Sequence, residues 1–279
     1  MKTMFMRFPG GKSKALTFSY DDNVEQDICL VEIFRKYGMR ATFNLNAGQF
    51  VPEGTVHPEG KVHRRMTAAQ VLSTYTPDVC EVACHSLNHP WLTACSSAVV
   101  CQQVIDDRRE LEKMFQMPIH GMAYPFGPTN DTVVDVLRLC GIYYSRTTVS
   151  TEKFDMPTDW LRLPATCHHK NPRLMELADK FISMNATRFP QLFYVWGHSY
   201  EFEEADNWHV IENFCEKMAN KDDIWYATNM EIYTAWADYM RLETSADGSM
   251  IFNPNCRDVW IADGKNNVFC IAPGQTLRV

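Results

Sequence analysis

Short runs of β-forming residues alternate along the chain with longer segments whose apolar residues recur at helical spacing. The first run, Ala15–Tyr20, ends at Asp21-Asp22-Asn23, and a helical pattern then extends over Val24–Tyr37 and stops at Gly38. The same order is repeated along the chain. Further strands are predicted at 41–45, 79–83, 142–145, 192–195 and 224–227, with one more leading into Ala123, and further helices from 68 and at 97–115, 131–140, 173–184, 209–218 and 230–240.

Repeated strand–helix units predict parallel strands covered by helices, in either an open sheet or a barrel. The polar residues favour the barrel. Asp21, His85, Pro125-Phe126 and His198 each follow a different predicted strand, and barrels assemble their active sites at the carboxyl ends of their strands. We therefore expect an α/β barrel of about seven strands. No glycine-rich dinucleotide or P-loop fingerprint follows any strand.

The pattern changes from Thr244 onward to short alternating strands separated by turn dipeptides such as Asp247-Gly248 and Asn253-Pro254. A segment of about 36 residues is too short to bury a core of its own. We expect a barrel domain at 1–243 and a small β-rich appendage at 244–279 that packs on the barrel.

Composition and charge exclude several classes of protein. Hydrophobic residues make up 46% of the 279 positions and charged residues 22%, which is typical of a folded globular chain. The net charge is −7 and Lys and Arg do not cluster, so no nucleic-acid partner is expected. The beginning of the chain lacks a signal-type apolar run, and no stretch is long and apolar enough to span a membrane. We expect a cytoplasmic protein without a membrane partner, whose ten scattered cysteines are reduced.

Two histidines and a pair of carboxylates form a candidate metal site. His85 and His89 are separated by three residues in HSLNH, and Asp21-Asp22 ends the first strand. One carboxylate and two imidazoles make a three-ligand catalytic site with a position open for water. Taken separately, the histidines also fit surface or capping positions, and the aspartates fit the N-cap of the following helix.

Cys80 and Cys84 offer a rival use of the same histidines, in a structural Cys2His2 zinc site. If 79–84 is a strand, the two cysteines lie about 13 Å apart along it, too far for one ion. That site would also leave Asp21-Asp22 without a role.

Four segments, TFSYDDN, HSLNH, AYPFG and FYVWGHSYEF, occur in an order and at separations that resemble the NodB-type polysaccharide deacetylases, carbohydrate esterase family 4. The resemblance covers about Ala15 to Met240. The segments YYSRTT, ATCHH and NPNCRDVWIADG are more similar to a bacterial branch that lacks a signal sequence. The resemblance implies a distorted (β/α)7 barrel and a metal-dependent hydrolase that removes N-acetyl or O-acetyl groups from an amino sugar, oligosaccharide or polysaccharide.

The resemblance also implies roles for individual residues. Asp21 would be the general base and His198 the general acid, Asp22, His85 and His89 would bind the metal, and the backbone N–H of Phe126 would stabilise the oxyanion. A bound divalent ion lowers the pKa of its water to about 7, which makes this water the nucleophile. Zn²⁺ suits the ligands best, and Co²⁺, Fe²⁺ and Ni²⁺ remain alternatives.

This chain departs from the family pattern at the arginine that would orient the base, because Ala123-Tyr124-Pro125 replaces R-x-P. Arg146 or Arg162 could supply that arginine, and either also fits a surface salt bridge. Trp160 could be a sugar-stacking wall or a packing residue. Further candidate base-orienting or substrate-binding residues are Tyr124, His168 and His169.

Two other functions remain open. One is hydrolysis of a small non-sugar amide or ureide on the same scaffold, and the other is carbohydrate binding without catalysis. A binding module does not need a base, a metal site and an acid together, which argues against the second. The expected partner is a carbohydrate substrate, and the sequence predicts neither its identity nor the oligomeric state.

Overall fold

The structure, a computed structural model, describes residues 3–185 and 188–279. Its central sheet consists of nine parallel strands. These are β2 (Lys14–Asp21), β3 (Ala41–Leu45), β4 (Cys80–Cys84), β5 (Gly121–Ala123), β6 (Tyr144–Ser150), β7 (Leu163–Ala165), β8 (Cys167–His168), β9 (Gln191–Gly197) and β10 (Ile224–Tyr226). The order is β7-β6-β5-β4-β3-β2-β9-β8, and β10 pairs with the first residues of β2.

The two ends of this sheet meet at a single residue. β7 pairs with β6 and β8 pairs with β9, and only Thr166 separates β7 from β8. The Thr166 N–H donates a hydrogen bond to the Tyr194 carbonyl at 2.9 Å. The segment 163–168 therefore joins β6 to β9 and acts as the seventh member of a ring with β2, β3, β4, β5, β6 and β9. This confirms the predicted α/β class and the distorted (β/α)7 barrel.

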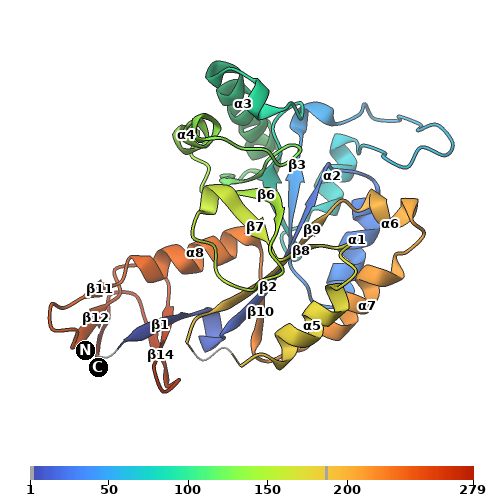
Figure 1. Cartoon of the computed structure of the whole chain (residues 1–279). Helices are drawn as coiled ribbons and strands as arrows, with labels where there is room; N and C mark the ends of the chain where they lie inside the picture. Colours follow the sequence, from blue (N-terminus) through green and yellow to red (C-terminus); the bar gives the residue numbers. More distant parts are fainter. Residues whose placement is uncertain (1–2, 186–187) are drawn as a thin grey trace.

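Helices cover the outside of the barrel. They are α1 (Gln26–Lys36), α2 (Ala68–Thr74), α3 (Ser97–Phe115), α4 (Asp131–Leu139), α5 (Leu174–Ser183), α6 (Tyr200–Glu204), α7 (His209–Met218) and α8 (Asn229–Met240), with single 3-10 turns η1 (Pro9–Gly11), η2 (Ala47–Gln49), η3 (Leu92–Ala94) and η4 (Trp160–Arg162). In Figure 1, α1, α5 and α7 lie together on one side of the strands, and α3 and α4 lie on another. The hydroxyls of Thr67 and Thr228 accept hydrogen bonds in capping boxes that start α2 and α8.

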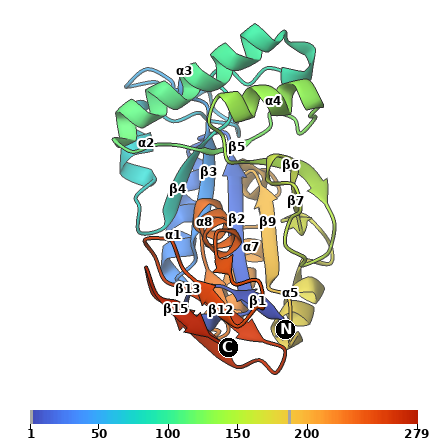
Figure 2. The same cartoon turned by 90° about the vertical axis from the view of Figure 1, so that its left-hand side faces the viewer.

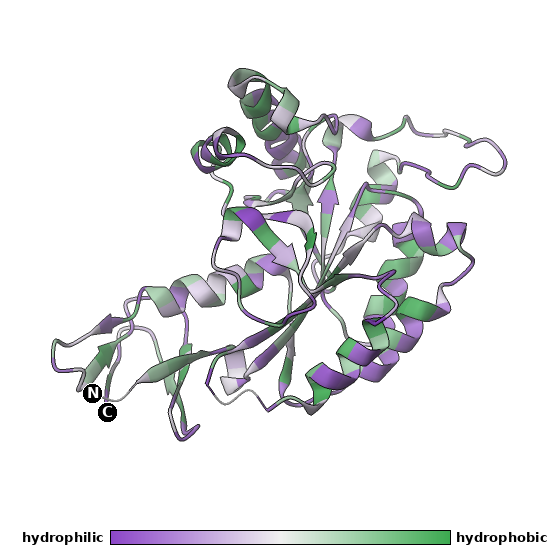
Figure 3. Ribbon diagram, viewed as in Figure 1, coloured by the Kyte–Doolittle hydropathy of each residue, from purple (hydrophilic) through white to green (hydrophobic). Residues whose placement is uncertain are grey.

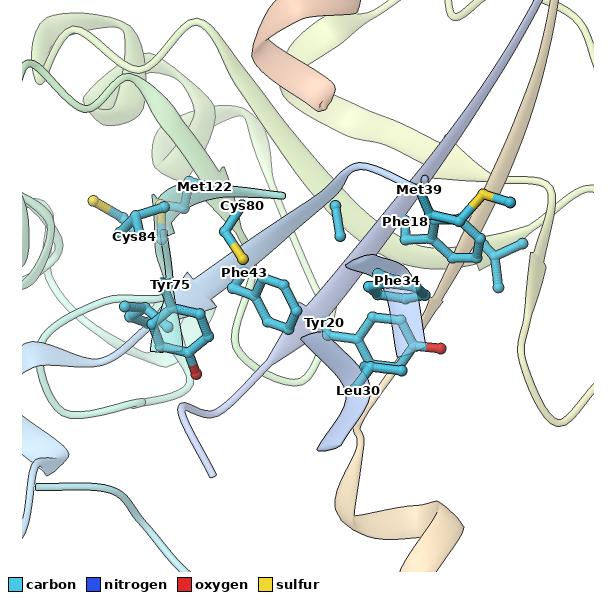
Figure 4. Packing of buried hydrophobic residues seen from close by; sticks show 14 of the residues in the cluster. Phe18, Tyr20, Leu30, Phe34, Met39, Phe43, Tyr75, Cys80, Cys84 and Met122 are labelled. Atoms are coloured by element: carbon cyan, nitrogen blue, oxygen red, sulfur yellow. The ribbon is translucent and has the colours of Figure 1, made fainter. Parts of the chain in front are cut away.

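The core forms where helices press aromatic and aliphatic side chains onto the strands. All eight residues of β2 are buried, as expected for a central parallel strand covered on both faces. Phe18 on β2 lies against Phe34 on α1, with ring centroids 4.5 Å apart (Figure 4). Figure 3 shows the matching amphipathic pattern, with apolar and polar faces on α5 and α7. This packing holds the carboxyl ends of the strands in fixed positions.

The last residues of the chain form two small antiparallel sheets. One contains β13 (Val259–Asp263) and β14 (Val268–Ile271), and the other contains β11 (Glu243–Thr244), β12 (Met250–Phe252) and β15 (Thr276–Arg278). β1 (Met4–Arg7), near the start of the chain, pairs with β13 (Figure 2). Sequence analysis did not anticipate this pairing. The division at residue 243 stays a prediction, and residues 1 and 2 of the expected barrel domain lie outside the described residues.

Within residues 3–185 and 188–279, the helices all fall short of the length and hydropathy that crossing a membrane requires.

Candidate metal centre and catalytic site

The predicted site residues converge at the carboxyl ends of four barrel strands. Asp21 is the last residue of β2 and Asp22 follows it, while His85 follows β4. Phe126 comes three residues after β5, and His198 follows β9 directly. The parallel order of the strands brings residues separated by more than 100 positions to one end of the barrel.

Asp22, His85 and His89 form a compact group of potential metal ligands. Their ligand atoms all lie within 4.8 Å of one another. The Nε2 atoms of His85 and His89 face each other at 3.1 Å. His85 Nδ1 lies 2.8 Å from the Ala123 carbonyl oxygen, to which it donates, so Nε2 of the neutral ring carries the lone pair. Two imidazole nitrogens in this position are well placed to share one cation.

The surroundings keep these groups in the forms that bind metal. Burial, together with His85, lowers the pKa of His89 to about 4, and burial also lowers the pKa of His85. Burial alone would raise the pKa of Asp22, but the hydrogen bond with His63 and the charge of Arg65 hold it far below its usual value. Asp22 Oδ1 is buried, and among the described residues its near neighbour is the Arg65 guanidinium at 3.1 Å, whose geometry is not that of a hydrogen bond. A carboxylate and two neutral imidazoles fit a divalent ion.

Cys80 and Cys84 are not part of this group. Both side chains are buried in the hydrophobic core, where Figure 4 shows them among Phe43, Tyr75 and Met122. Among the described residues, His85 and His89 are grouped with Asp22 and not with sulfur ligands. The structure therefore contradicts the Cys2His2 alternative.

The backbone at the site adopts conformations that side chains other than glycine disfavour. Asp22 has φ +86°, His89 has φ +56° and Phe126 has φ +61°. Such left-handed residues persist where the surrounding structure holds them, and they are concentrated at functional sites. Three of the predicted site residues share this property.

Asp21 is almost completely buried and is held at both carboxylate oxygens. Asn44 Nδ2 donates to Oδ1 at 2.8 Å, and the Arg146 guanidinium pairs with Oδ2. Arg146 is itself buried and lies over the Trp196 ring, 4.5 Å from its centroid. Burial alone would raise the pKa of Asp21, but Arg146, His85 and His198 hold it below its usual value.

Arg146 thus takes the position expected of the missing family arginine, and Arg162 does not. Arg162 pairs at the surface with Asp159 at 2.9 Å and with Asp131. The sequence predicted the strand around Tyr144 to end at Ser145, but β6 continues to Ser150. This extension places Arg146 on the strand, where its side chain reaches β2.

His198 faces the base on one side and a glutamate on the other. Its Nε2 lies 3.8 Å from Asp21 Oδ2, and its Nδ1 lies 3.7 Å from Glu201 Oε2. Burial would lower the pKa of His198, but the neighbouring carboxylates of Glu201, Asp21 and Asp22 raise it. The protonated form is therefore favoured at this position, in contrast to His85 and His89.

Glu201 is the centre of a cluster of histidine and lysine side chains. Its Oε2 lies 3.2 Å from His168 Nε2 and 3.1 Å from His169 Nε2, and its Oε1 lies 2.9 Å from Lys170 Nζ. Burial would raise the pKa of Glu201, but the hydrogen bonds with the histidines lower it far below its usual value. Glu201 is therefore ionised at neutral pH and places a negative charge next to His198.

Three of the other candidates for base orientation or substrate binding are buried, namely Trp160, Tyr124 and His169. Trp160 is buried and packs against Tyr233 and Trp236. Tyr124 is buried and donates its hydroxyl to the Leu161 carbonyl at 2.6 Å. The contacts of Trp160 fit its packing alternative, and a substrate-binding role for either residue stays a prediction.

His169 is also buried, with its ring stacked on Tyr20 and Phe202. A Cβ at Gly197 would overlap its ring, so the glycine leaves room for it. His169 therefore lies in the interior next to Glu201, whereas His168 is partly exposed beside Trp196.

Sequence reasoning missed several residues that contact the site. Arg65 Nη2 lies 3.1 Å from Asp22 Oδ1, and His63 Nε2 lies 3.4 Å from Asp22 Oδ2. Both lie in the long connection between η2 and α2, which has no regular hydrophobic pattern. The adjacent basic residues HRR were the only local signal. Glu201 follows His198 by three residues, and this spacing could have predicted a contact between the two side chains.

Comparison with known proteins supports a family assignment. Residues 8–145 match the family model described as polysaccharide deacetylase. No curated protein matches the chain.

Many solved structures match at low identity. One from Mycobacterium smegmatis, described as a putative polysaccharide deacetylase, is 14% identical over 81% of this chain and 91% of that chain, with a TM-score of 0.59. A family 4 carbohydrate esterase from Streptomyces lividans in complex with acetate is 16% identical over 76% of this chain and 91% of that chain, with a TM-score of 0.49. A deacetylase from Streptococcus pyogenes in complex with acetate is 22% identical over 47% of this chain and 55% of that chain, with a TM-score of 0.42.

The mycobacterial structure shows the shared fold, and residues 8–145, which match the family model, include Asp21, Asp22, His85 and His89. The chain therefore belongs to the NodB-type family of polysaccharide deacetylases.

Proposed function

We propose that this protein is a metal-dependent hydrolase that removes acetyl groups from an amino sugar, an oligosaccharide or a polysaccharide. The observation that carries the proposal is the close approach of Asp22, His85 and His89, within 4.8 Å, next to the Asp21–Arg146 pair and the His198–Glu201 pair. Within this proposal, residues 1–243 form the catalytic domain and 244–279 a β-rich extension.

Asp22, His85 and His89 would hold one divalent ion. When bound, such an ion lowers the pKa of water to about 7 and polarises the acyl oxygen. Zn²⁺ is the first choice for one carboxylate and two imidazoles, with Co²⁺, Fe²⁺ and Ni²⁺ as alternatives.

Asp21 accepts a proton from the attacking water. The low pKa of Asp21 keeps it ionised at neutral pH, and Arg146 and Asn44 fix the direction of its two oxygens. This restraint matters because proton transfer requires the acceptor to lie within hydrogen-bond reach of the water.

His198 delivers a proton to the departing nitrogen. An amide hydrolyses to acetate and an amine, and the nitrogen leaves as a neutral amine only when it is protonated. The raised pKa of His198 favours the protonated form, and Glu201 near Nδ1 leaves the Nε2 proton available on the side of Asp21. The backbone N–H of Phe126, in its left-handed turn, is proposed to donate to the oxyanion.

The test is mass spectrometry of acetylated amino sugars and short oligosaccharides after incubation with the zinc- or cobalt-loaded protein. Loss of acetyl groups with the wild type, and not with Asp21→Asn, is the expected result. If wild-type protein that holds its metal removes no acetyl group from any sugar, the proposal is overturned in favour of a small amide or ureide as substrate.

A further inference from the structure

Two exposed aromatic rings stand beside the candidate metal site. Trp91 is 51% exposed and Phe126 is 47% exposed. Their rings stack with centroids 4.3 Å apart and an interplanar angle of 8°. Phe126 also contacts the His89 ring edge to face, at 4.5 Å. This pair, called the aromatic platform below, is therefore continuous with the proposed metal ligands.

The backbone turn that places the aromatic platform at the surface has an unfavourable local conformation. Phe126 has φ +61°, which is unfavourable for a bulky residue. The next residue, Gly127, has φ +92°, and a Cβ there would overlap Thr148 on β6. The turn is thus packed tightly against the barrel while its aromatic ring faces solvent. Neither the strain nor the exposed apolar surface stabilises the fold, and the combination is typical of a ligand site.

Hydrogen-bonding side chains border the other part of the site, around Asp22 and His198. The His63 ring, partly exposed, lies 4.9 Å from the Tyr200 ring, and Tyr200 lies 5.3 Å from the His198 ring. The site therefore has an apolar stacking surface at His89 and polar groups at His198. A pyranose ring has matching chemistry, because its C–H face packs on aromatic rings and its hydroxyls accept and donate hydrogen bonds.

We propose that the aromatic platform is a binding subsite for a pyranose ring of the substrate, adjacent to the acetyl group that is hydrolysed. In an acetamido sugar, the carbonyl carbon is two bonds from the ring carbon that carries the amide. If the backbone N–H of Phe126 binds the acyl oxygen, the sugar ring must lie within a few ångströms of the Phe126 and Trp91 side chains. This inference rests on the proposed function for the position of the acetyl group, but it can be tested by binding alone.

The test measures the affinity of the N-acetylglucosamine tetramer by calorimetry, with zinc-loaded Asp21→Asn as the parent protein so that no turnover occurs. Adding Trp91→Ala is expected to weaken binding about three- to tenfold, the range of a single aromatic contact. Trp91→Phe should restore part of the affinity.

Tyr143→Ala is the matched control. Tyr143 is 44% exposed and also belongs to a stacked pair, with His120 at 4.2 Å and 9°, but it precedes β6 and so lies at the amino ends of the strands. This control should bind like the parent. An unchanged affinity in Trp91→Ala, an equal loss in Tyr143→Ala, or a parent that does not bind the tetramer would each overturn the proposal.

A kinetic measurement separates lost stacking from a damaged site. With otherwise wild-type protein, Trp91→Ala should raise KM for the tetramer several-fold and change kcat much less, because stacking contributes mainly to binding of the sugar ring. A fall in kcat with an unchanged KM contradicts a stacking role. If the wild type releases no acetate from the tetramer while the parent still binds it through Trp91, the proposed function fails and the binding subsite stands.

Discussion

The proposed metal half and the proposed proton-transfer half of the site use the same residue type, histidine, under opposite electrostatic conditions. Burial and the mutual approach of two imidazoles lower the pKa of His89 to about 4. At His198, the carboxylates of Glu201 and Asp21 outweigh burial and raise the pKa. The comparison shows that neighbouring groups, and not the histidine itself, separate a neutral ligand from a protonated acid.

Substitution of the two adjacent aspartates is expected to have the largest effects on metal content and turnover. Asp22→Asn should lose the metal and reduce kcat by about a thousandfold or more, because a neutral amide is a poor ligand. Asp21→Asn should keep the metal and lose turnover to a similar degree. Metal content by mass spectrometry and acetate release together check both outcomes. Equal metal loss in the two variants would contradict the division of roles.

His198→Ala tests the protonated member of the pair. Removal of a general acid should reduce amide hydrolysis about 10²- to 10⁴-fold. Hydrolysis of 4-nitrophenyl acetate should fall much less, because its leaving group needs no proton. The ratio of the two rates is the measurement, and an unchanged ratio would argue that His198 is not the acid.

The two candidate arginines allow a matched test of which one orients the proposed base, Asp21. Arg146→Lys keeps the charge but loses the planar guanidinium, and we expect kcat to fall about ten- to a hundredfold because Asp21 is less well oriented. Arg162→Lys changes only a surface ion pair and should have no measurable effect. Similar activity in both variants would remove the role assigned to Arg146.

Glu201→Gln tests, through the pH profile of activity, how far Glu201 raises the pKa of His198. The protonated form of His198 is present below its pKa, so activity falls as pH rises through that value. Glu201 raises this pKa, and its neutralisation should therefore move the fall in activity to lower pH. At pH 8 the loss should reach about tenfold, and Glu201→Asp should restore part of it. A profile that drops uniformly without moving would indicate a purely structural role.

Local sequence pattern was enough to predict the long helices and several strands. The predicted helices 97–115 and 209–218 have the bounds of α3 and α7. β3 likewise has the predicted bounds. Apolar periodicity and capping residues are contained within each element, which is why they can be read without the fold.

The elements that close the structure were missed because their signals are not local. β7 and β8 have only three and two residues, too few for a period to show. Their pairing depends on β6 and β9, which come from other parts of the chain. β1 likewise becomes a strand next to β13, more than 250 residues later.

Short motifs in the sequence carry the candidate site residues that could be named without the fold. Asp21-Asp22, His85 and His89 follow predicted strands, and parallel strands must present their carboxyl ends together. These residues and His198 could be named before the fold was known.

Which other side chains reach these residues depends on the fold. It selected Arg146 over Arg162, buried Trp160 away from the site and brought Arg65 to Asp22. The physical reason is that an ion pair depends on distances of a few ångströms between residues far apart in the chain, and such distances are set by packing. The local pattern around each residue is the same whether or not the contact forms.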